Sequence, residues 1–163
     1  MRIDAMTTPA PLGQIGDLAR RIQSAGFSGL LFTETGRTAY LNAAVASQAA
    51  PALELSTGVA VAFPRSPFVT AAAAWELQEA TCGKFRLGLG TQVRTHVVRR
   101  YGVDFERPGP RLRDYLLAVR RASPRFAPGS LITTASFTTS ISLRRSGAPG
   151  PLTLLIPKWT SRP

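Results

Sequence analysis

Three consecutive pieces of this chain decide its fold class: LELSTGVAVAF (53–63), PFVTAAAAWELQEAT (67–81) and FRLGL (85–89). The first and last pieces are short apolar runs rich in small and β-branched residues, which is typical of buried strands. The middle piece has the length of a helix and begins with Pro67, a residue favoured in the first helical turn. Gly83 follows this piece and predicts its end. A strand, a helix and a second strand in this order predict a parallel βαβ unit.

The same alternation continues on both sides of this unit. Apolar residues recur every three or four positions over 12–25, which predicts an amphipathic helix. We expect further strands at 2–6 (RIDAM) and 27–33 (FSGLLFT), and further helices at 41–49, 92–101 and 108–121. Strands that alternate with helices in this way predict an α/β fold with a parallel sheet that is covered on both faces.

Chain length bears on the choice between two arrangements of such units. One is an open doubly wound sheet, and the other is a (β/α)8 barrel. The chain has 163 residues, whereas a full barrel needs about 250. If the units belong to a barrel, the chain therefore supplies roughly half of one.

Composition excludes several classes of protein. The single cysteine, Cys82, and the single histidine, His96, exclude an internal disulfide, a cysteine-based zinc cluster and a multi-histidine metal site, so we expect no metal. The residues after Met1 show no apolar run of a signal peptide. No apolar stretch reaches the roughly 18 residues that a membrane span needs. We therefore expect a soluble cytoplasmic protein without a membrane partner.

The net charge of +11 is a common sign of a nucleic-acid partner, but its distribution weakens that interpretation. All nine acidic residues lie within 1–114, so the positive excess gathers in 115–163, which has seven Lys or Arg and no acidic residue. The sequence shows no helix-turn-helix pattern, no RNA-binding aromatic signature and no zinc finger. Nucleic acid is therefore a disfavoured partner.

Three motifs at the ends of predicted strands are candidates for a ligand site. LGLGTQ (87–92) contains glycines that let a ligand approach the backbone, but it lacks the third glycine of a dinucleotide fingerprint and also fits a plain turn. STGVAV (56–61) has a glycine inside a strand, which indicates either a bulge or a backbone face presented to a flat ring. FTETGR (32–37) contains Glu34, which is a candidate base, a candidate ring-contacting acceptor, or a helix-capping carboxylate.

Other conspicuous side chains have simpler explanations. We expect a solvated helix face to carry four of them: Arg94, His96, Arg99 and Arg100. We expect the hydrophobic core to contain three more: Phe68, Trp75 and Leu77. Cys82 follows a helix end without an activating neighbour and is expected to be inert.

Four blocks of the chain carry a resemblance to a known family: AGFSGLLFTET (25–35), LELSTGVAVAFPRSP (53–67), KFRLGLGTQV (84–93) and RRYGVDFERPGPRLRDYLLAVR (99–120). In order and spacing they resemble the bacterial-luciferase-like monooxygenase superfamily, and they are most similar to its branch of coenzyme F420-dependent oxidoreductases. The resemblance covers about residues 1–121. It implies a partial (β/α)8 TIM barrel that consists of the first four βα units.

The resemblance also implies a cofactor and a site. Members of the family bind F420 or FMN at the carboxyl ends of the barrel strands, and they transfer a hydride or activate oxygen for a small-molecule substrate. We expect F420, with FMN as the alternative. A bulge in the family's third strand, often with a cis peptide bond, corresponds to Gly58–Val59. The implied catalytic residues are Glu34 and Thr35, and the implied cofactor-binding residues are Thr33, Thr57, Gly58, Val59, Gly90, Thr91 and Gln92.

The chain departs from the family after its fourth predicted unit. Full barrels are roughly twice as long as residues 1–121, and residues 122–163 show no strand–helix pattern, which predicts an irregular, disordered basic tail. A second hypothesis is a frameshifted continuation of the family sequence. One shift of reading frame, with suitable synonymous codons, lets 131–137 and 150–162 encode acidic, family-like segments.

Three functions therefore stay open. The first is a truncated oxidoreductase of the luciferase-like class. The second is a non-catalytic half-barrel that completes its sheet by pairing with another copy as a homodimer, because half a barrel leaves strand edges open. The third is a basic protein that binds nucleic acid through its tail, which a steep salt dependence of binding would reveal.

Overall fold

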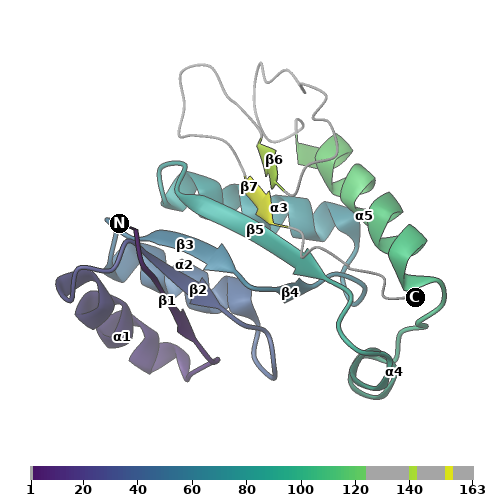
Figure 1. Ribbon diagram of the computed structural model, residues 1–163, viewed down its shortest axis with the longest axis horizontal. Helices are drawn as coiled ribbons and strands as arrows, with labels where there is room; N and C mark the ends of the chain where they lie inside the picture. The colour runs from purple at the N-terminus through teal and green to yellow at the C-terminus, as the bar shows by residue number, and fades with distance from the viewer. Residues whose placement is uncertain (1, 124–139, 143–152, 156–163) are drawn as a thin grey trace.

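A parallel sheet forms the centre of the fold (Figure 1). The computed structural model describes residues 2–123, 140–142 and 153–155. Four strands lie side by side in the order β1 (Asp4–Thr7), β2 (Gly29–Phe32), β3 (Glu54–Thr57) and β5 (Phe85–Gly90). Each adjacent pair is parallel. The predicted α/β class and the parallel arrangement of the four strands are thus confirmed.

Helices pack against this sheet and against one another. They are α1 (Leu12–Ser24), α2 (Ala39–Ala49), α3 (Pro67–Ala80) and α5 (Pro108–Ala122), while the short α4 (Arg94–Tyr101) follows the end of β5. α1 packs on α2, α2 on α3, and α3 on α5. Fully buried strand side chains such as Phe32, Leu55 and Leu87 join the apolar helix residues in one core. Within the described part, no helix has the length and apolar character needed to cross a membrane.

The other face of the sheet is less covered than the sequence predicts. Met6 of β1 is 72% exposed, and Leu31, its partner in the register, is only partly buried. Glu54 forms ion pairs with Arg2 and Arg86, the latter on the neighbouring strand. In a closed barrel this face lines the interior and is covered by strands from the opposite wall. The described strands β1, β2, β3 and β5 form one wall, so the expectation of cover on both faces is wrong for them.

Most predicted boundaries agree with the structure to within two residues. The exception is the predicted strand 53–63, which is divided into β3 and the short β4 (Ala60–Val61). Ser66 explains the start of α3, because its hydroxyl accepts a hydrogen bond from the Val69 N–H at 3.2 Å. Leu77 is buried as expected, but Phe68 is 50% exposed, so its assignment to the core is wrong. Phe68 lies in the first turn of α3, where a side chain can extend past the core.

Two described segments lie in the region that was expected to be an irregular tail. β7 (Thr153–Leu155) pairs in parallel with β5, and β6 (Ser140–Ser142) pairs antiparallel with β7. These short strands extend the sheet beyond β5. Ala122, the first residue of that region, ends α5. The predictions of disorder and of a frameshift over 124–139, 143–152 and 156–163 fall on residues outside those that the structure describes.

Candidate functional site

The candidate site lies at the carboxyl ends of the parallel strands, where ligands bind in barrels and in open α/β sheets. Nine predicted site residues share this position because β2, β3 and β5 are adjacent and parallel. They are Thr33, Glu34 and Thr35 after β2, Thr57, Gly58 and Val59 at the end of β3, and Gly90, Thr91 and Gln92 at the end of β5. The topology thus brings the predicted residues to one edge of the sheet.

A bulge between β3 and β4 shapes this edge. Ser56 pairs with Arg86 while Ala60 pairs with Leu89, so the β3–β4 segment advances four residues as β5 advances three. The extra residue falls at Gly58–Val59, where the peptide bond is cis. The bulge and the cis bond are both confirmed at the dipeptide that the family resemblance implied. The bulge also accounts for the division of the predicted strand.

Thr57 closes the gap that the bulge opens toward β5. Its hydroxyl donates to the Gly88 carbonyl at 2.8 Å and accepts from the Gly88 N–H at 2.9 Å. A bulge leaves ladder groups of the neighbouring strand without backbone partners, and the hydroxyl serves both groups of Gly88. Thr57 has no exposed surface. Its side chain therefore supports the bulge from behind and does not extend toward a ligand.

The bulge and its neighbours form a small apolar shelf, which consists of Leu31, Gly58, Val59 and Gly90. A methyl group on Gly58 would overlap the side chain of Leu31, and one on Gly90 would lie 2.7 Å from Cγ2 of Val59. Both contacts are shorter than carbon atoms tolerate, so any larger residue at these positions would force the neighbouring side chain to move. Leu31, Gly58 and Val59 are only partly buried. The shelf therefore presents apolar surface at the edge where the predicted residues gather.

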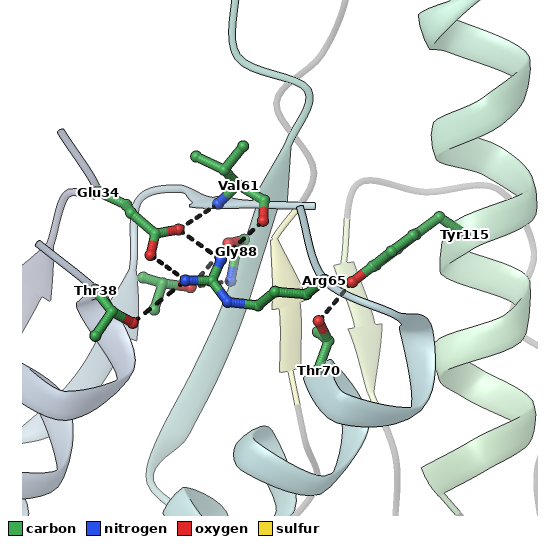
Figure 2. A network of polar contacts seen from close by, with 8 residues as sticks. Glu34, Thr38, Val61, Arg65, Thr70, Gly88 and Tyr115 are labelled. Carbon is green, nitrogen blue, oxygen red and sulfur yellow. Dashed lines mark hydrogen bonds and ion pairs between the residues drawn. The ribbon is translucent and has the colours of Figure 1, made fainter. Parts of the chain in front are cut away.

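Glu34 and Arg65 form a buried ion pair beside the bulge (Figure 2). Arg65 Nη2 lies 2.5 Å from Glu34 Oε1, and Arg65 Nη1 donates to Oε2 at 2.9 Å. The Val61 N–H donates to the same Oε2 at 2.6 Å, and Arg65 Nη1 also donates to the Val61 carbonyl at 3.0 Å. The Glu34 side chain is 3% exposed and that of Arg65 is 22% exposed. Both carboxylate oxygens of Glu34 are thus engaged by donors.

The surroundings of Arg65 keep it charged and fixed. Burial alone lowers the pKa of Arg65, but the hydrogen bond and the charge of Glu34 raise it, and the net pKa is raised. Arg65 Nη2 also donates to the Thr38 hydroxyl at 3.3 Å. Its guanidinium carbon lies 5.0 Å from the centre of the Tyr40 ring, within the range of a cation–π contact. The arginine is therefore held by the end of β2 and by the start of α2.

Two buried phenols, those of Tyr40 and Tyr115, lie near the Glu34–Arg65 ion pair. The Tyr40 hydroxyl has no hydrogen-bond partner among the described residues, and burial raises the pKa of Tyr40 well above its ordinary value. The Tyr115 hydroxyl lies 2.5 Å from the Thr70 hydroxyl (Figure 2). Burial raises the pKa of Tyr115 as well, although the hydrogen bond with Thr70 opposes the shift. Both phenols are therefore neutral at physiological pH, and the second joins α5 to α3.

Polar residues border the shelf. Thr33, Thr91 and Gln92 are partly buried, and Thr35 is exposed. The Thr33 hydroxyl donates to a carbonyl of β1 at 3.3 Å. Gln92 has a left-handed φ of 59°, which turns the chain from β5 toward α4. From α4, Arg100 donates to the Thr35 carbonyl at 2.6 Å, so this helix lies close to the end of β2.

The remaining conspicuous residues are exposed. His96, Arg94 and Arg99 lie on the surface of α4, as predicted. Cys82 is also exposed.

Arg65, by contrast, was not singled out by the sequence patterns although it is central to the site. The available signal was a charged residue between two prolines in FPRSP (63–67), directly after an apolar strand.

The fold and the site together define a class: one wall of a parallel (β/α) barrel, with a bulged strand and a glycine-containing shelf at the carboxyl ends of its strands. The chain belongs to the luciferase-like monooxygenase family, whose family model matches residues 1–151. The predicted family and the predicted partial barrel are thereby confirmed.

Relatives of this chain are longer than the chain itself. An uncharacterised protein of Mycobacterium tuberculosis is 35% identical over 112 residues, which cover 69% of this chain and 33% of that protein. This chain therefore spans about a third of the length of that relative.

Two solved structures show the same fold at low sequence identity. The coenzyme F420-dependent tetrahydromethanopterin reductase of Methanopyrus kandleri superposes with a TM-score of 0.63 at 14% identity, over 74% of this chain and 39% of that one. The oxygenating constituent of 3,6-diketocamphane monooxygenase of Pseudomonas putida, in complex with FMN, superposes with a TM-score of 0.66 at 13% identity, over 82% and 42%.

Proposed function

We propose that this chain provides the ring-binding wall of an oxidoreductase that uses F420, or alternatively FMN, on a small organic substrate. The observation that carries the proposal is the partly exposed apolar shelf of Leu31, Gly58, Val59 and Gly90. A flat heteroaromatic ring needs an apolar surface to lie on and a few polar groups at its edge. The shelf and its border of hydroxyl and amide groups fit both requirements.

The choice of cofactor is supported by two comparisons. The reductase of Methanopyrus kandleri is F420-dependent, and the monooxygenase of Pseudomonas putida is in complex with FMN. F420 is the first choice because the sequence blocks are most similar to the F420-dependent branch of the family. Either cofactor supplies redox chemistry when bound, F420 by hydride transfer and FMN by hydride transfer or oxygen activation, while the protein supplies binding and orientation.

We assign roles to the predicted site residues from their positions. The backbone and side chains of the shelf would face the ring, while Thr33, Thr91 and Gln92 would contact its polar edge. Thr35 is exposed beside the shelf and is our candidate for contact with the substrate. Glu34 remains part of the proposed site, but its engaged oxygens favour action through Arg65 and Val61 rather than as a free base.

A titration of the whole chain with F420 and with FMN, followed by the fluorescence of the ring, tests the proposal. We expect saturable but weak binding, because phosphate sites of barrels commonly come from later loops and the chain covers 39% and 42% of the two solved relatives. Val59→Asn places a polar group on the shelf and should abolish binding. Val69→Asn is the matched control, because Val69 lies on α3 and is 55% exposed.

Two results would refute the proposal. One is the absence of saturable binding of either cofactor at any concentration tested. The other is binding that Val59→Asn leaves equal to that of the Val69→Asn control, because the ring would then lie away from the shelf.

A second candidate function is a half-barrel that pairs with a second copy of itself. Among the described strands, β1 pairs with β2 alone. The side chain of Met6, on β1, is 72% exposed. A free strand edge with exposed apolar side chains favours the addition of another strand. Sedimentation equilibrium should then show a dimer that Met6→Lys dissociates and that Leu41→Lys, at a 53% exposed position on α2, leaves intact. A monomeric wild-type chain would exclude this candidate.

A further inference from the structure

The backbone of β4 has one side that none of the described strands covers. On one side, the Ala62 N–H donates to the Gly90 carbonyl at 3.0 Å, so this part of the chain faces β5. Successive residues of a strand direct their backbone groups to opposite sides. The N–H and C=O of Val61 therefore point away from β5, toward the side where β2 lies.

The backbone of β2 does not extend far enough to serve these groups. The last hydrogen bond between the two segments is from the Gly58 N–H to the Phe32 carbonyl at 2.8 Å. β2 ends at Phe32, and the chain then leaves the sheet toward α2. Val61 is fully buried, and buried backbone groups need partners. A partner for Val61 must therefore come from side chains.

Glu34 and Arg65 supply both partners. The carboxylate of Glu34 accepts from the Val61 N–H at 2.6 Å, where a strand would offer a carbonyl. The guanidinium of Arg65 donates to the Val61 carbonyl at 3.0 Å, where a strand would offer an N–H. Two further hydrogen bonds, at 2.5 and 2.9 Å, join the two side chains to each other.

We infer that Glu34 and Arg65 are positioning residues that replace a missing strand segment and so fix the shelf on which the cofactor ring would rest. The inference rests on the proposed function for the identity of the ring. It deepens that function because it assigns Glu34 to the geometry of the site. Val61 follows the bulge by two residues, so a fixed Val61 sets the position of Gly58 and Val59.

The chemistry of the two side chains suits this task. Arginine is planar and presents several N–H groups in a fixed fork, so it can hold two carboxylate oxygens and a carbonyl at once. Lysine keeps the charge but lacks the fork. Glutamine in place of Glu34 keeps one acceptor but turns an NH2 group toward the guanidinium. Arg65→Lys and Glu34→Gln are therefore conservative changes that remove the geometry rather than the volume.

Amide hydrogen exchange of the whole chain, with single-residue resolution, tests the inference directly. In Glu34→Gln, the Val61 N–H loses its charged acceptor, so we expect its amide to exchange about tenfold faster or more. In Arg65→Lys, the N–H keeps the Glu34 carboxylate but loses the fork that fixes this carboxylate and the Val61 carbonyl, so we expect faster exchange of the same amide by a smaller factor. Amides in β1 should keep the exchange rates of the wild type. Arg20→Lys is the matched control, because Arg20 forms an exposed ion pair with Asp17 within α1.

Cofactor titration provides the second readout. Both variants should weaken binding of F420 or FMN in proportion to the loss of protection at Val61, whereas Arg20→Lys should leave it unchanged. An unchanged Val61 amide in both variants would overturn the inference. If Glu34→Gln speeds amide exchange throughout the fold, Arg65→Lys, the milder change, decides the question. An unchanged exchange rate of the Val61 amide in that variant then overturns the inference. If the wild type binds neither cofactor, the proposed function fails, and the exchange rates still decide whether the pair fixes Val61.

Discussion

Replacing Thr57 by valine should show how much the side-chain bridge across the bulge stabilises the fold. Thr57→Val keeps the shape of the side chain and removes the hydroxyl that donates to the Gly88 carbonyl and accepts from its N–H. A buried polar group that loses its partner costs about 1–3 kcal/mol. Two such groups are lost, and the apolar gain of a buried methyl, about 0.8 kcal/mol, offsets part of the cost. We expect the free energy of unfolding to fall by about 2–4 kcal/mol.

Urea unfolding followed by far-ultraviolet circular dichroism at pH 7 measures this change. Thr57→Ser is the matched control, because it keeps the hydroxyl and loses one methyl group, which costs about 1 kcal/mol. The expected order of stability is wild type, then serine, then valine. A valine variant within about 0.5 kcal/mol of the wild type, inside the range of an ordinary surface substitution, would refute the reasoning. Equal losses in the serine and valine variants would refute it too, because the methyl group would then be responsible.

Three further predictions have defined outcomes. Gly90→Ala places a methyl group 2.7 Å from Cγ2 of Val59 and should lower the free energy of unfolding by about 1–3 kcal/mol through overpacking. Gly13→Ala, in a helix with open space around it, should raise the free energy of unfolding by about 0.5–1 kcal/mol. Thermal unfolding compares the two variants, and equal effects would contradict the packing of the shelf. Because burial raises the pKa of Tyr40 and Tyr115, unfolding releases their protons once the pH exceeds the ordinary tyrosine pKa of about 10. Stability should therefore be intact below pH 10 and fall above it. Tyr40→Phe removes a hydroxyl without a partner in the described part of the chain, so its free energy of unfolding should fall less between pH 8 and pH 11 than that of the wild type. An equal fall in urea unfolding would contradict this. The coding DNA beyond α5 should contain an open, family-like sequence one base out of frame, and stop codons scattered through that frame would exclude the frameshift.

The order of strands and helices could be predicted from the sequence because it depends on local periodicity. The apolar runs near Leu30, Leu55 and Leu87 and the repeat of apolar residues over 12–25 are visible without any knowledge of contacts. The same holds for the ends of α3, which Pro67 and Gly83 mark within a few residues. Local chemistry therefore fixes most of the element boundaries.

The contents of the site could be predicted only in part, because they depend on pairs that are distant in the sequence. Glu34 is 31 residues from Arg65, and Thr57 is 31 residues from Gly88. No periodicity links such positions, so a carboxylate that looked like a candidate base could not be distinguished from one already engaged. The glycine of STGVAV (56–61) indicated either a bulge or a ring-facing backbone, and the family resemblance was needed to assign the bulge and the cis bond to Gly58–Val59. Exposure of Met6 could not be foreseen either, since it depends on which strands face the sheet.

The two side-chain bridges around the bulge have a consequence for protein engineering. A grafted loop that carried only residues 57–65 into a host barrel would bring Thr57 and Arg65 but not Glu34. The transplanted Arg65, whose side chain is 22% exposed in this chain, would then be a partly buried cation without its counter-charge, which is destabilising. A successful graft must therefore include an acidic residue just past the preceding strand of the host and an unobstructed glycine backbone opposite Thr57, so the transferable unit spans three neighbouring strands rather than one loop.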